Sequence, residues 1–567
     1  MFCNVGTEVC FHDTIKAIAR EGVQVAYQWW QGAVVYRIYV RSFQDSNGDG
    51  VGDLMGLISR LGYVEDLGVD AIWLTPVFDS PNFDFGFDVS DFLTVQKELG
   101  TLSDFDLLIE EAHKRGIKVI VDLLLNHTSI EHPWFIQSRS STEGEYAGYY
   151  IWSDEIPNNW IAAFGGKAWT LDSVRGQYYM HSFFRQQPDL NWRNPKVVDE
   201  LFAVTRFWLD RGIDGVRLDV INSIAKDETL RSNPKVLGTR SRVYDRQRHI
   251  FDRNRPESYT RVRQVRRLVD EYDDRVLIGE IMAEFPGEPE LAASYLGQKG
   301  DQLNLSLDSS LANARFSAQS WKRVAKRWYE ATGRLRDPGW VLNSHELSRF
   351  STRVKGDLDK MKLAALFLMT QRGTIFIYYG EELGLPDSVV WPKEMKDPLG
   401  KRFWPFMKSR DVSRGPMVWS TGPGNGFTSG ESWLPFTKSA NFYSVENQAL
   451  EKDSMLTFYR TIIALRSDDL VLQMGHCHFM ECKNSNILIY TRSSEEGRRM
   501  VILNMSKKVQ TCSLADVLER EEAVALRLFS THIDGRAKET GEGDVELVPW
   551  QGSVYDLVDQ RRKSRSS

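Results

Sequence analysis

The feature that most constrains this 567-residue chain is a regular alternation of short apolar runs and amphipathic stretches, from about residue 29 to residue 460. Strands buried on both faces consist of nearly continuous apolar residues, and their alternation with helices is typical of parallel βα units. Eight such units predict an α/β fold, a closed (β/α)8 TIM barrel whose active site lies at the carboxyl ends of its strands. The candidate strands are Val34–Phe43, Ala71–Phe78, Lys118–His127, Gly215–Ile221, Val276–Met282, Gln302–Leu307, Trp340–Glu346 and Thr374–Gly380.

Amphipathic stretches with helical spacing lie between these strands and after the last of them. Their apolar residues recur every three to four positions, which places them on one face of a helix. The candidate helices are Asp53–Leu67, Thr101–Arg115, Pro195–Arg211, Ser258–Tyr272, Arg315–Thr332, Asp357–Gln371 and Ser454–Arg466.

Two long departures from the alternation divide the chain into domains. About 65 residues rich in Trp, Tyr, Gly and Asn separate the third strand from the helix at Pro195, too many for a βα loop, so we expect a small subdomain over the barrel mouth. Short alternating strands near the end predict a C-terminal antiparallel β-sandwich. The predicted parts are an N-terminal extension at 1–28 with a short helix at Asp13–Glu21, the barrel at 29–127 and 191–466, the inserted subdomain at 128–190, the β-sandwich domain at 467–558 and a basic tail at 559–567.

Composition excludes several classes of function. Lys and Arg total 71 against 77 Asp and Glu, a formal charge of −6, which argues against a nucleic-acid-binding surface. No stretch reaches about 18 apolar residues, so we expect no membrane span. Five cysteines without metal-ligand spacing favour a reducing, cytoplasmic location. Aromatic residues make up 12% of the chain, and they either stack on sugar faces or fill a large core.

Polar side chains close several of the otherwise apolar strands. Asp219, Glu280 and Glu346 end strands four, five and seven, and His127 ends strand three. A retaining glycosidase needs two carboxyl groups roughly 5–5.5 Å apart, one to attack the anomeric carbon and one to protonate the leaving oxygen. Adjacent strands lie about 4.8 Å apart, so residues that end strands four and five can meet this spacing.

The two carboxyl groups of such a pair have opposite electrostatic requirements. Arg217 lies two residues before Asp219 on the same strand face, where its guanidinium would keep Asp219 ionised, as a nucleophile must be. An acid at Glu280 needs a raised pKa, which nearby carboxylates and partial burial would supply.

These segments resemble, in order and spacing, the short sequence regions of glycoside hydrolase family 13, the α-amylase family, in its α-glucosidase and oligo-1,6-glucosidase branch, over about residues 29–500. The resemblance implies a retaining enzyme that cleaves small α-glucosides, acts as a monomer or homodimer and forms a covalent glucosyl-enzyme. It implies Asp219 as nucleophile, Glu280 as acid/base and Arg217 as the supporting cation. His127 and His345 would bind hydroxyls of the glucose in the cleaved subsite.

Two further segments agree with this resemblance. Asp84-Phe85-Gly86-Phe87-Asp88 is similar to the loop whose first Asp fixes the non-reducing end of the substrate and whose aromatic residue, here Phe87, stacks on the same glucose. The Arg partner of Asp84 is expected to be Arg414, and an Asp–Arg pair at one end of the pocket implies exo action. The segment Gln187–Asn191 resembles the marker of the oligo-1,6-glucosidase branch.

Oxygen-bearing residues occupy alternate positions between Asp45 and Asp53, with glycines among them. Such a loop can wrap a hard cation through side chains and one backbone carbonyl, and the alternative is an Asx-rich turn without metal. An EF-hand is not expected because position twelve lacks a Glu. The loop resembles the structural Ca²⁺ (or Mg²⁺) site after the first strand in the α-glucosidase branch. The implied ligands are Asp45, Asn47, Asp49, Val51 and Asp53.

Three positions, Glu346, Phe87 and Gly415, depart from the usual family pattern, and Gly415 replaces the usual Thr. Glu346 stands where the family usually has Asp, so its carboxylate is extended by one methylene, and a misplacement of about 1 Å can cost roughly 10²-fold in rate. We nevertheless expect retained activity, and count Glu346 among the catalytic residues. Phe87 replaces the more usual Tyr and preserves stacking. Val220, directly after Asp219, is the residue type associated with α-1,6 cleavage in one subgroup.

Two alternatives remain open from the sequence. The covalent glucosyl-enzyme could be attacked by an alcohol or sugar instead of water, which would make the chain an α-glucosyl transferase or a sucrose-active hydrolase or isomerase. A more distant alternative is a non-catalytic relative that serves as a binding or accessory protein. Such relatives typically lose catalytic residues, whereas Arg217, Asp219 and Glu280 are all present here.

Overall fold

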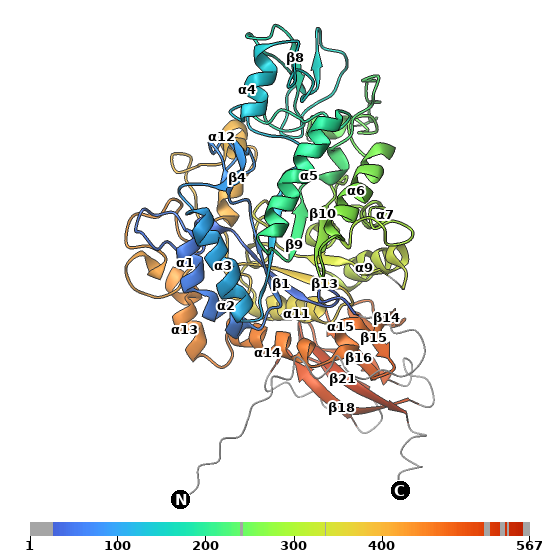
Figure 1. Cartoon of the computed structure of the whole chain (residues 1–567). Coiled ribbons are helices and arrows are strands. Elements are labelled where there is room, and N and C mark those ends of the chain that lie inside the picture. The colour runs from blue at the N-terminus through green and yellow to red at the C-terminus, as the bar shows by residue number, and fades with distance from the viewer. Residues whose placement is uncertain are drawn as a thin grey trace, which may run out of the picture.

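A computed structural model describes residues 27–238, 242–334, 336–514, 522–532, 539–540 and 544–559. Eight parallel strands form a closed barrel in the order β1-β13-β12-β11-β10-β9-β5-β2, which confirms the predicted (β/α)8 fold (Figure 1). Seven of the eight candidate strands contain a whole barrel strand, and the seventh barrel strand in the chain begins at Gly339, one residue before its candidate. The barrel strands are β1 (Val34–Ile38), β2 (Ala71–Leu74), β5 (Lys118–Leu123), β9 (Gly215–Leu218), β10 (Val276–Glu280), β11 (Leu305–Leu307), β12 (Gly339–Val341) and β13 (Thr374–Tyr378).

Helices surround the barrel close to the predicted positions. The stretch Asp53–Leu67 is an exception, because it forms two helices that meet at Arg60, whose φ of −108° and ψ of 5° are not helical. Asp53 caps the first of them by accepting a hydrogen bond from the Gly56 N–H. The main helices are α1 (Leu54–Ser59), α2 (Leu61–Leu67), α3 (Leu102–Lys114), α5 (Pro195–Asp210), α6 (Pro256–Val269), α7 (Pro289–Ser294), α9 (Ala318–Thr332), α11 (Leu358–Met369) and α14 (Met455–Ser467).

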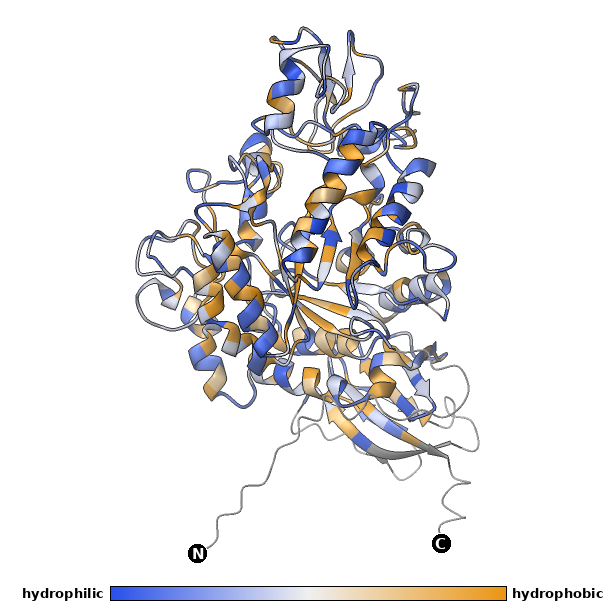
Figure 2. Cartoon of the chain, in the orientation of Figure 1, coloured by the Kyte–Doolittle hydropathy of each residue, from blue (hydrophilic) through white to orange (hydrophobic). Residues whose placement is uncertain are grey.

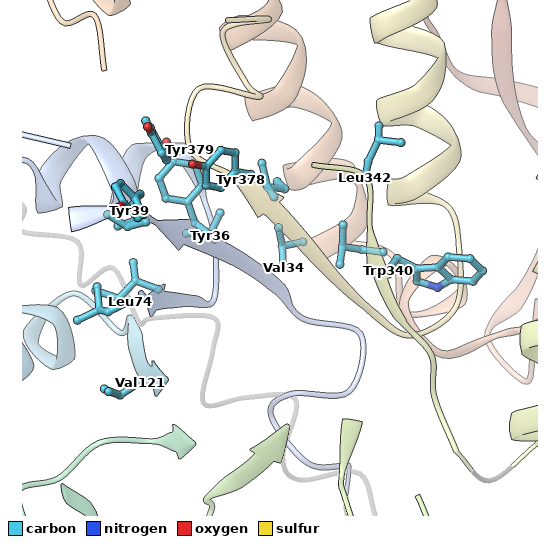
Figure 3. Close-up of a cluster of buried hydrophobic side chains, with 14 of the residues drawn as sticks. Val34, Tyr36, Tyr39, Leu74, Val121, Trp340, Leu342, Tyr378 and Tyr379 are labelled. Carbon is cyan, nitrogen blue, oxygen red and sulfur yellow. The ribbon is translucent and has the colours of Figure 1, made fainter. Parts of the chain in front are cut away.

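Alternation along the strands produces two apolar layers. Val35 of β1 faces the barrel interior, where it packs in one cluster with Trp73 and Phe376. Val34 and Tyr36, on the opposite face of β1, belong to the larger layer between the strands and the surrounding helices (Figure 3). Most residues of the barrel strands are accordingly hydrophobic, and much of the barrel is orange in Figure 2.

A small subdomain lies between β5 and β9 in the chain, over the barrel (Figure 1). It contains α4 (Pro133–Ser140) and a three-stranded sheet of β6 (Trp152–Ser153), β8 (Tyr178–Met180) and β7 (Trp169–Leu171). Trp160, Trp169 and Met180 form a core of its own. Another small sheet pairs β3 (Phe78–Asp79) with β4 (Asp91–Val95), and these strands enclose the loop that carries Asp84 and Phe87.

Antiparallel sheets follow α14 and α15 (Leu470–Met474), as predicted. Residues of both sheets share one hydrophobic cluster, so the domain is a sandwich. Its first sheet consists of β14 (His476–Phe479), β15 (Ile487–Ser494), β16 (Gly497–Asn504), β21 (Gly552–Asp559) and β18 (Glu522–Ser530), and its second of β17 (Gln510–Ser513), β20 (Asp544–Leu547) and β19 (Glu539–Thr540).

The predicted helix at 13–21 and the basic tail, apart from its first residue, lie outside the described residues. Within the described ranges, no helix is both long and apolar enough to cross a membrane.

A buried carboxyl group ties β1 to the surrounding helices and to the segment after β13. The Tyr36 and Tyr63 hydroxyls each donate a hydrogen bond of 2.7 Å to Glu382 Oε1. Glu382 is fully buried, and burial raises its pKa to about 7. The group therefore keeps its proton in the folded protein at pH values at which the unfolded chain has lost it.

This pKa predicts a loss of stability as the pH rises. Between the ordinary pKa of 4.5 and about 7, the folded state binds more protons at Glu382 than the unfolded state does. An upward change of this size corresponds to about 3 kcal/mol once the pH exceeds 7. We expect Glu382→Gln, which stays neutral, to be more stable relative to wild type at pH 8 than at pH 5.

Thermal unfolding at the two pH values measures this effect, with Glu496→Gln as the matched change of an exposed carboxylate. An equal difference between Glu382→Gln and wild type at both pH values would contradict the prediction.

Candidate active site

One buried arginine joins the acidic residues at the ends of three neighbouring strands. Arg217 is 1% exposed, and its Nη1 lies 2.8 Å from Asp219 Oδ1 and 3.1 Å from Asp122 Oδ1. Its Nη2 contacts Glu280 Oε2. Because Asp219 and Glu280 bind the two terminal nitrogens of one guanidinium, their carboxyl groups must lie close together. The arrangement suits a retaining pair, whose carboxyl groups lie roughly 5–5.5 Å apart.

The register of the barrel strands explains why these carboxylates contact Arg217. Arg217 of β9 is paired with Asp122 of β5 on one side and with Ile278 of β10 on the other. Residues two apart face the same side of a strand, so Asp219 and Glu280 lie one step nearer the barrel mouth than this layer. Side-chain exposure rises from 0% at Asp122 to 13% at Asp219 and 35% at Glu280. Asp122 therefore forms the base of the cluster, and the other two carboxylates face the mouth.

The backbone turns sharply directly after Asp219. Val220 has a φ of 39° and a ψ of 43°, a left-handed conformation that strains a β-branched side chain. Such strain, about 1–3 kcal/mol, persists only where the surroundings impose it, and it concentrates at active sites. Val220 belongs to a small buried hydrophobic cluster that includes Phe183 and Tyr244.

A second arginine closes another part of the site. Arg410 Nη2 lies 2.6 Å from Asp84 Oδ1 and 2.8 Å from Asp397 Oδ1, and its Nη1 lies 3.3 Å from Glu346 Oε1. The extra methylene of Glu346 thus extends its carboxylate to Arg410. Burial raises the pKa of Asp84, although Arg410 and the Arg414 guanidinium act in the opposite direction.

The predicted pairing of Asp84 with Arg414 is wrong, because Arg410 takes that place. A short 3₁₀ turn at Arg410–Ser413 separates the two arginines, and Asp397 holds Arg410 toward Asp84 through three hydrogen bonds. Arg414 instead donates from Nε to the His345 carbonyl and lies over the Tyr39 ring. Its Nη1 and Nη2 are buried and have no hydrogen-bond partner in the described structure.

His345 lies between aromatic rings and arginines. Its ring stacks on Phe87 and on Tyr39, with ring centroids 5.2 and 5.9 Å away. Both ring nitrogens are buried without a hydrogen-bond partner among the described residues. Burial and the neighbouring arginines, Arg37 foremost, lower the pKa of His345 well below its usual value, so the ring is neutral at pH 7. A neutral ring with two free nitrogens can donate to one sugar hydroxyl and accept from another.

The segment 187–191 helps to position His127 and the loop that carries Phe87. His127 Nε2 lies 2.9 Å from the Phe87 carbonyl, and Gln187 donates to the same carbonyl at 2.9 Å. Two residues on, Asp189 is paired with the buried Lys226 at 2.8 Å. The segment thus joins the Phe87 loop, the end of β5 and the chain after β9, and places His127 and Phe87 beside each other.

The predicted metal loop is closed by its own hydrogen bonds. Asp45 accepts from the N–H groups of Asn47, Gly48 and Gly50, and Asp49 accepts from the Val51 N–H. In the described part of the chain, no group of three or more His, Cys, Asp or Glu side chains is arranged to hold a metal ion. A cation here would therefore depend on the Asn47 amide oxygen and a backbone carbonyl as well as on carboxylates.

A cavity of about 540 Å³ lies between the inserted subdomain and the chain after β9. Trp152, Trp192 and Asp227 are among its lining residues, whereas Asp219 and Glu280 are not. It is therefore distinct from the carboxylate cluster.

Comparison with known proteins assigns this architecture to a class. The family model "Alpha amylase, catalytic domain" matches residues 37–475. A probable α-glucosidase of Rhizobium meliloti (strain 1021) is 41% identical over 92% of this chain and 96% of its own length, and an oligo-1,6-glucosidase of Parageobacillus thermoglucosidasius is 35% identical over 93% and 99%. The chain belongs to the α-amylase family of glycoside hydrolases.

Two solved structures are similar over nearly the whole chain. The α-glucosyl transfer enzyme XgtA is 36% identical with a TM-score of 0.86, and the alignment covers 94% of this chain and 99% of XgtA. The trehalulose synthase MutB of Pseudomonas mesoacidophila MX-45 is 30% identical with a TM-score of 0.84, covering 94% and 100%.

Sequence reasoning missed three contributors to the site. Arg410 and Asp397 lie in a long excursion after the eighth strand, where no periodic pattern indicates which charged side chains point inward. The third is Asp122, which lies inside an apolar strand directly beside Arg217. An acidic residue in a strand otherwise buried on both faces was a usable signal for a charge partner.

Asp122 generates a stability prediction. Removing one partner from a buried ion pair costs about 3–5 kcal/mol, whereas exposed pairs contribute about 0–1 kcal/mol. We expect Asp122→Asn to lower the free energy of unfolding by about 3 kcal/mol, the lower end of the range for buried pairs. The loss is not larger because Arg217 keeps two other carboxylates.

Denaturant unfolding measures the change, with Glu145→Gln as the control. Glu145 and its partner Lys196 are both more than half exposed. Equal effects of the two substitutions would show that Arg217 does not need Asp122.

Proposed function

We propose that the chain is a retaining α-glucosidase that removes single glucose residues from short α-glucosides. The observation that carries the proposal is the contact of Asp219 and Glu280 with one buried guanidinium at the barrel mouth. The relatives named α-glucosidase and oligo-1,6-glucosidase, aligned over nearly the whole chain, support the same activity.

In the first step, the Asp219 carboxylate attacks the anomeric carbon and forms a glucosyl ester. The bond to the leaving oxygen breaks, and Glu280 donates its proton to that oxygen. Arg217 Nη1 lies 2.8 Å from Asp219 Oδ1, and this ion pair holds the attacking carboxylate in position.

In the second step, the Glu280 carboxylate takes a proton from water, whose oxygen attacks the anomeric carbon. The ester bond to Asp219 breaks, and the product keeps the α configuration. An alcohol or sugar can replace water, and the similarity to XgtA, a glucosyl transfer enzyme, supports transfer as the second candidate activity.

The ion pairs of Arg410 support exo action. Arg410 joins Asp84 to Glu346, and the neutral His345 ring lies beside Phe87. Such a group of charged and polar side chains suits the hydroxyls of a terminal glucose. Glu346 is suited to hold sugar hydroxyls in the transition state, with Arg410 fixing its carboxylate.

The roles of the two carboxylates are tested by azide rescue, because each role predicts a different product. In Glu280→Ala, azide should attack the glucosyl ester and give the α-glucosyl azide. In Asp219→Ala, azide should displace the leaving group of an activated donor directly and give the β-azide. Both variants should otherwise lose about 10³-fold or more in kcat.

Nuclear magnetic resonance of the products distinguishes the two anomers. Rescue of either variant with the opposite anomer, or labelling of another residue by an inhibitor that traps glucosyl esters, would contradict the assignment.

The corrected ion pair predicts unequal roles for the two arginines. Arg410→Lys keeps the charge but cannot span Asp84, Asp397 and Glu346 together, and misplacing these groups by about 1 Å can cost roughly 10²-fold in kcat/KM. Arg414→Lys should cost less, because Arg414 does not contact those carboxylates. Steady-state kinetics on maltose and isomaltose measures both variants, and a larger loss in Arg414→Lys would contradict the prediction.

We also propose that the loop from Asp45 to Asp53 binds Ca²⁺ or Mg²⁺ in a structural role. The donor set is all oxygen, as these ions require, and Gly48 and Gly50 have the positive φ values that let a short loop wrap an ion. No catalytic candidate lies in the loop. The cytoplasmic location and the monomeric or homodimeric state stay predictions.

Calcium should raise the thermal midpoint of the chelator-treated protein, because an ion bound to the folded state alone stabilises that state. Asp49→Ala should abolish the increase, whereas Asp106→Ala, a change in an exposed ion pair, should retain it. An equal midpoint in calcium and in chelator would contradict the proposal.

A further inference from the structure

The cavity of about 540 Å³ outside the carboxylate cluster lies where three parts of the chain meet. Residues of the inserted subdomain, of the chain after β9 and of helix α6 line it, among them Arg175, Glu228 and Arg261. Pockets that bind small organic ligands have volumes of about 300–1,000 Å³, so this cavity can hold a molecule of that size.

Two guanidinium groups line this cavity without a carboxylate partner. Arg261 of α6 donates from Nη1 to Gln264 at 2.8 Å, and Arg175 of the subdomain donates to backbone carbonyls and to Gln177. Within the described ranges, neither arginine forms an ion pair with a carboxylate. Burial lowers the pKa of both, and the charge of Arg193 lowers that of Arg261 further. A bound anion would therefore stabilise both charged groups.

Two of the acidic residues that line the cavity are already neutralised by other cations. Asp227 lies 2.5 Å from Arg231 and 3.1 Å from Arg255, and neither arginine lines the cavity. Glu257 is paired with Arg193 at 2.8 Å. The charges of these two carboxylates are thus compensated locally and do not offset the two unpaired guanidinium groups.

Two further polar side chains of the lining have free hydrogen-bonding capacity. Glu228 and Thr142 are exposed, and neither side chain forms a hydrogen bond or an ion pair with another described residue. An ionised carboxylate only accepts hydrogen bonds, so Glu228 requires a donor such as a hydroxyl group, whereas the Thr142 hydroxyl both donates and accepts. The cavity therefore offers contacts for an anionic group and for hydroxyl groups together.

Aromatic residues of the cavity wall are bonded to the chain on either side of His127. Trp192 donates from Nε1 to the Leu125 carbonyl at 2.8 Å, and the Tyr150 hydroxyl lies 2.7 Å from Thr128 Oγ1. A molecule that packs against this wall consequently restricts the position of His127.

We propose that this cavity is a second binding site, for a sugar that carries an anionic group. The phosphate or carboxylate group of the sugar contacts Arg175 and Arg261, and its hydroxyls donate to Glu228. The bound sugar connects the inserted subdomain to α6 and stabilises the position of His127 in the glucose pocket. The site goes beyond the proposed α-glucosidase activity, and binding to it does not depend on that activity.

Isothermal titration calorimetry of the full-length protein tests the site, with glucose 6-phosphate and glucuronate as probes. Arg261→Gln should weaken the binding of each probe that binds about tenfold or more, as the loss of a charged hydrogen bond does. Arg261→Lys keeps the charge and should lose less. Arg267→Gln changes an exposed arginine of the same helix outside the cavity, and it should bind as the wild type does.

Glu228 distinguishes the contacts of the sugar from those of its anionic group. Glu228→Ala should weaken the binding of glucose 6-phosphate but not that of inorganic phosphate, which lacks the sugar hydroxyls. Inorganic phosphate alone should bind to the wild type about tenfold more weakly than glucose 6-phosphate, because it forms only the contacts with the arginines.

Steady-state kinetics separates the cavity from the glucose pocket. Saturating glucose 6-phosphate should lower the KM for maltose, or for another α-glucoside that the enzyme cleaves, because the position of His127 is stabilised. In Arg261→Gln the KM should stay unchanged. A probe bound in the glucose pocket would compete with the substrate and raise the apparent KM in both proteins.

Each outcome decides one part of the inference. Binding of only one probe supports the site and identifies the anionic group as phosphate or carboxylate. Absence of binding by both probes, or binding that neither Arg261→Gln nor Glu228→Ala changes, overturns the site. Binding through Arg261 with an unchanged KM retains the site and overturns its link to His127. A protein that binds the probes but cleaves no α-glucoside overturns the proposed function alone.

Discussion

The candidate active site depends on one charged guanidinium, that of Arg217, which is buried away from water below the mouth of the barrel. An isolated buried cation costs several kcal/mol, and Arg217 is 1% exposed. Three carboxylates from three adjacent strands compensate this cost, and parallel pairing of β5, β9 and β10 brings them to it. The same contacts that stabilise the cation also hold Asp219 and Glu280 close to each other.

A second buried arginine, Arg410, is likewise compensated by carboxylates at another part of the site. Arg410 is buried between Asp84, Asp397 and Glu346, and Asp397 in turn caps α12. These two ionic clusters leave His345 as a neutral ring among cations.

Sequence patterns predicted the elements more closely than their ends. Seven of the eight barrel strands lie inside their predicted runs, and β12 begins one residue earlier, because burial on both faces leaves a strong apolar signal. The helix predicted at Asp53–Leu67 is two helices, since a break at one residue leaves the apolar spacing almost unchanged. The prediction that Asp84 pairs with Arg414, and not with Arg410, was wrong for a related reason. Two arginines four residues apart in an irregular segment carry no periodic signal of the direction in which each points.

The sequence alone determined the barrel, the inserted and C-terminal domains, and which strand ends carry Asp219, Glu280 and Glu346. These follow from local patterns of apolar and polar residues. Only the tertiary structure decided which charges meet: Asp122 beneath Arg217, and Arg410 on Asp84 across 326 residues of chain. Ion pairs form between side chains that folding brings together, and their energy depends on burial and distance, which no local pattern of residues encodes.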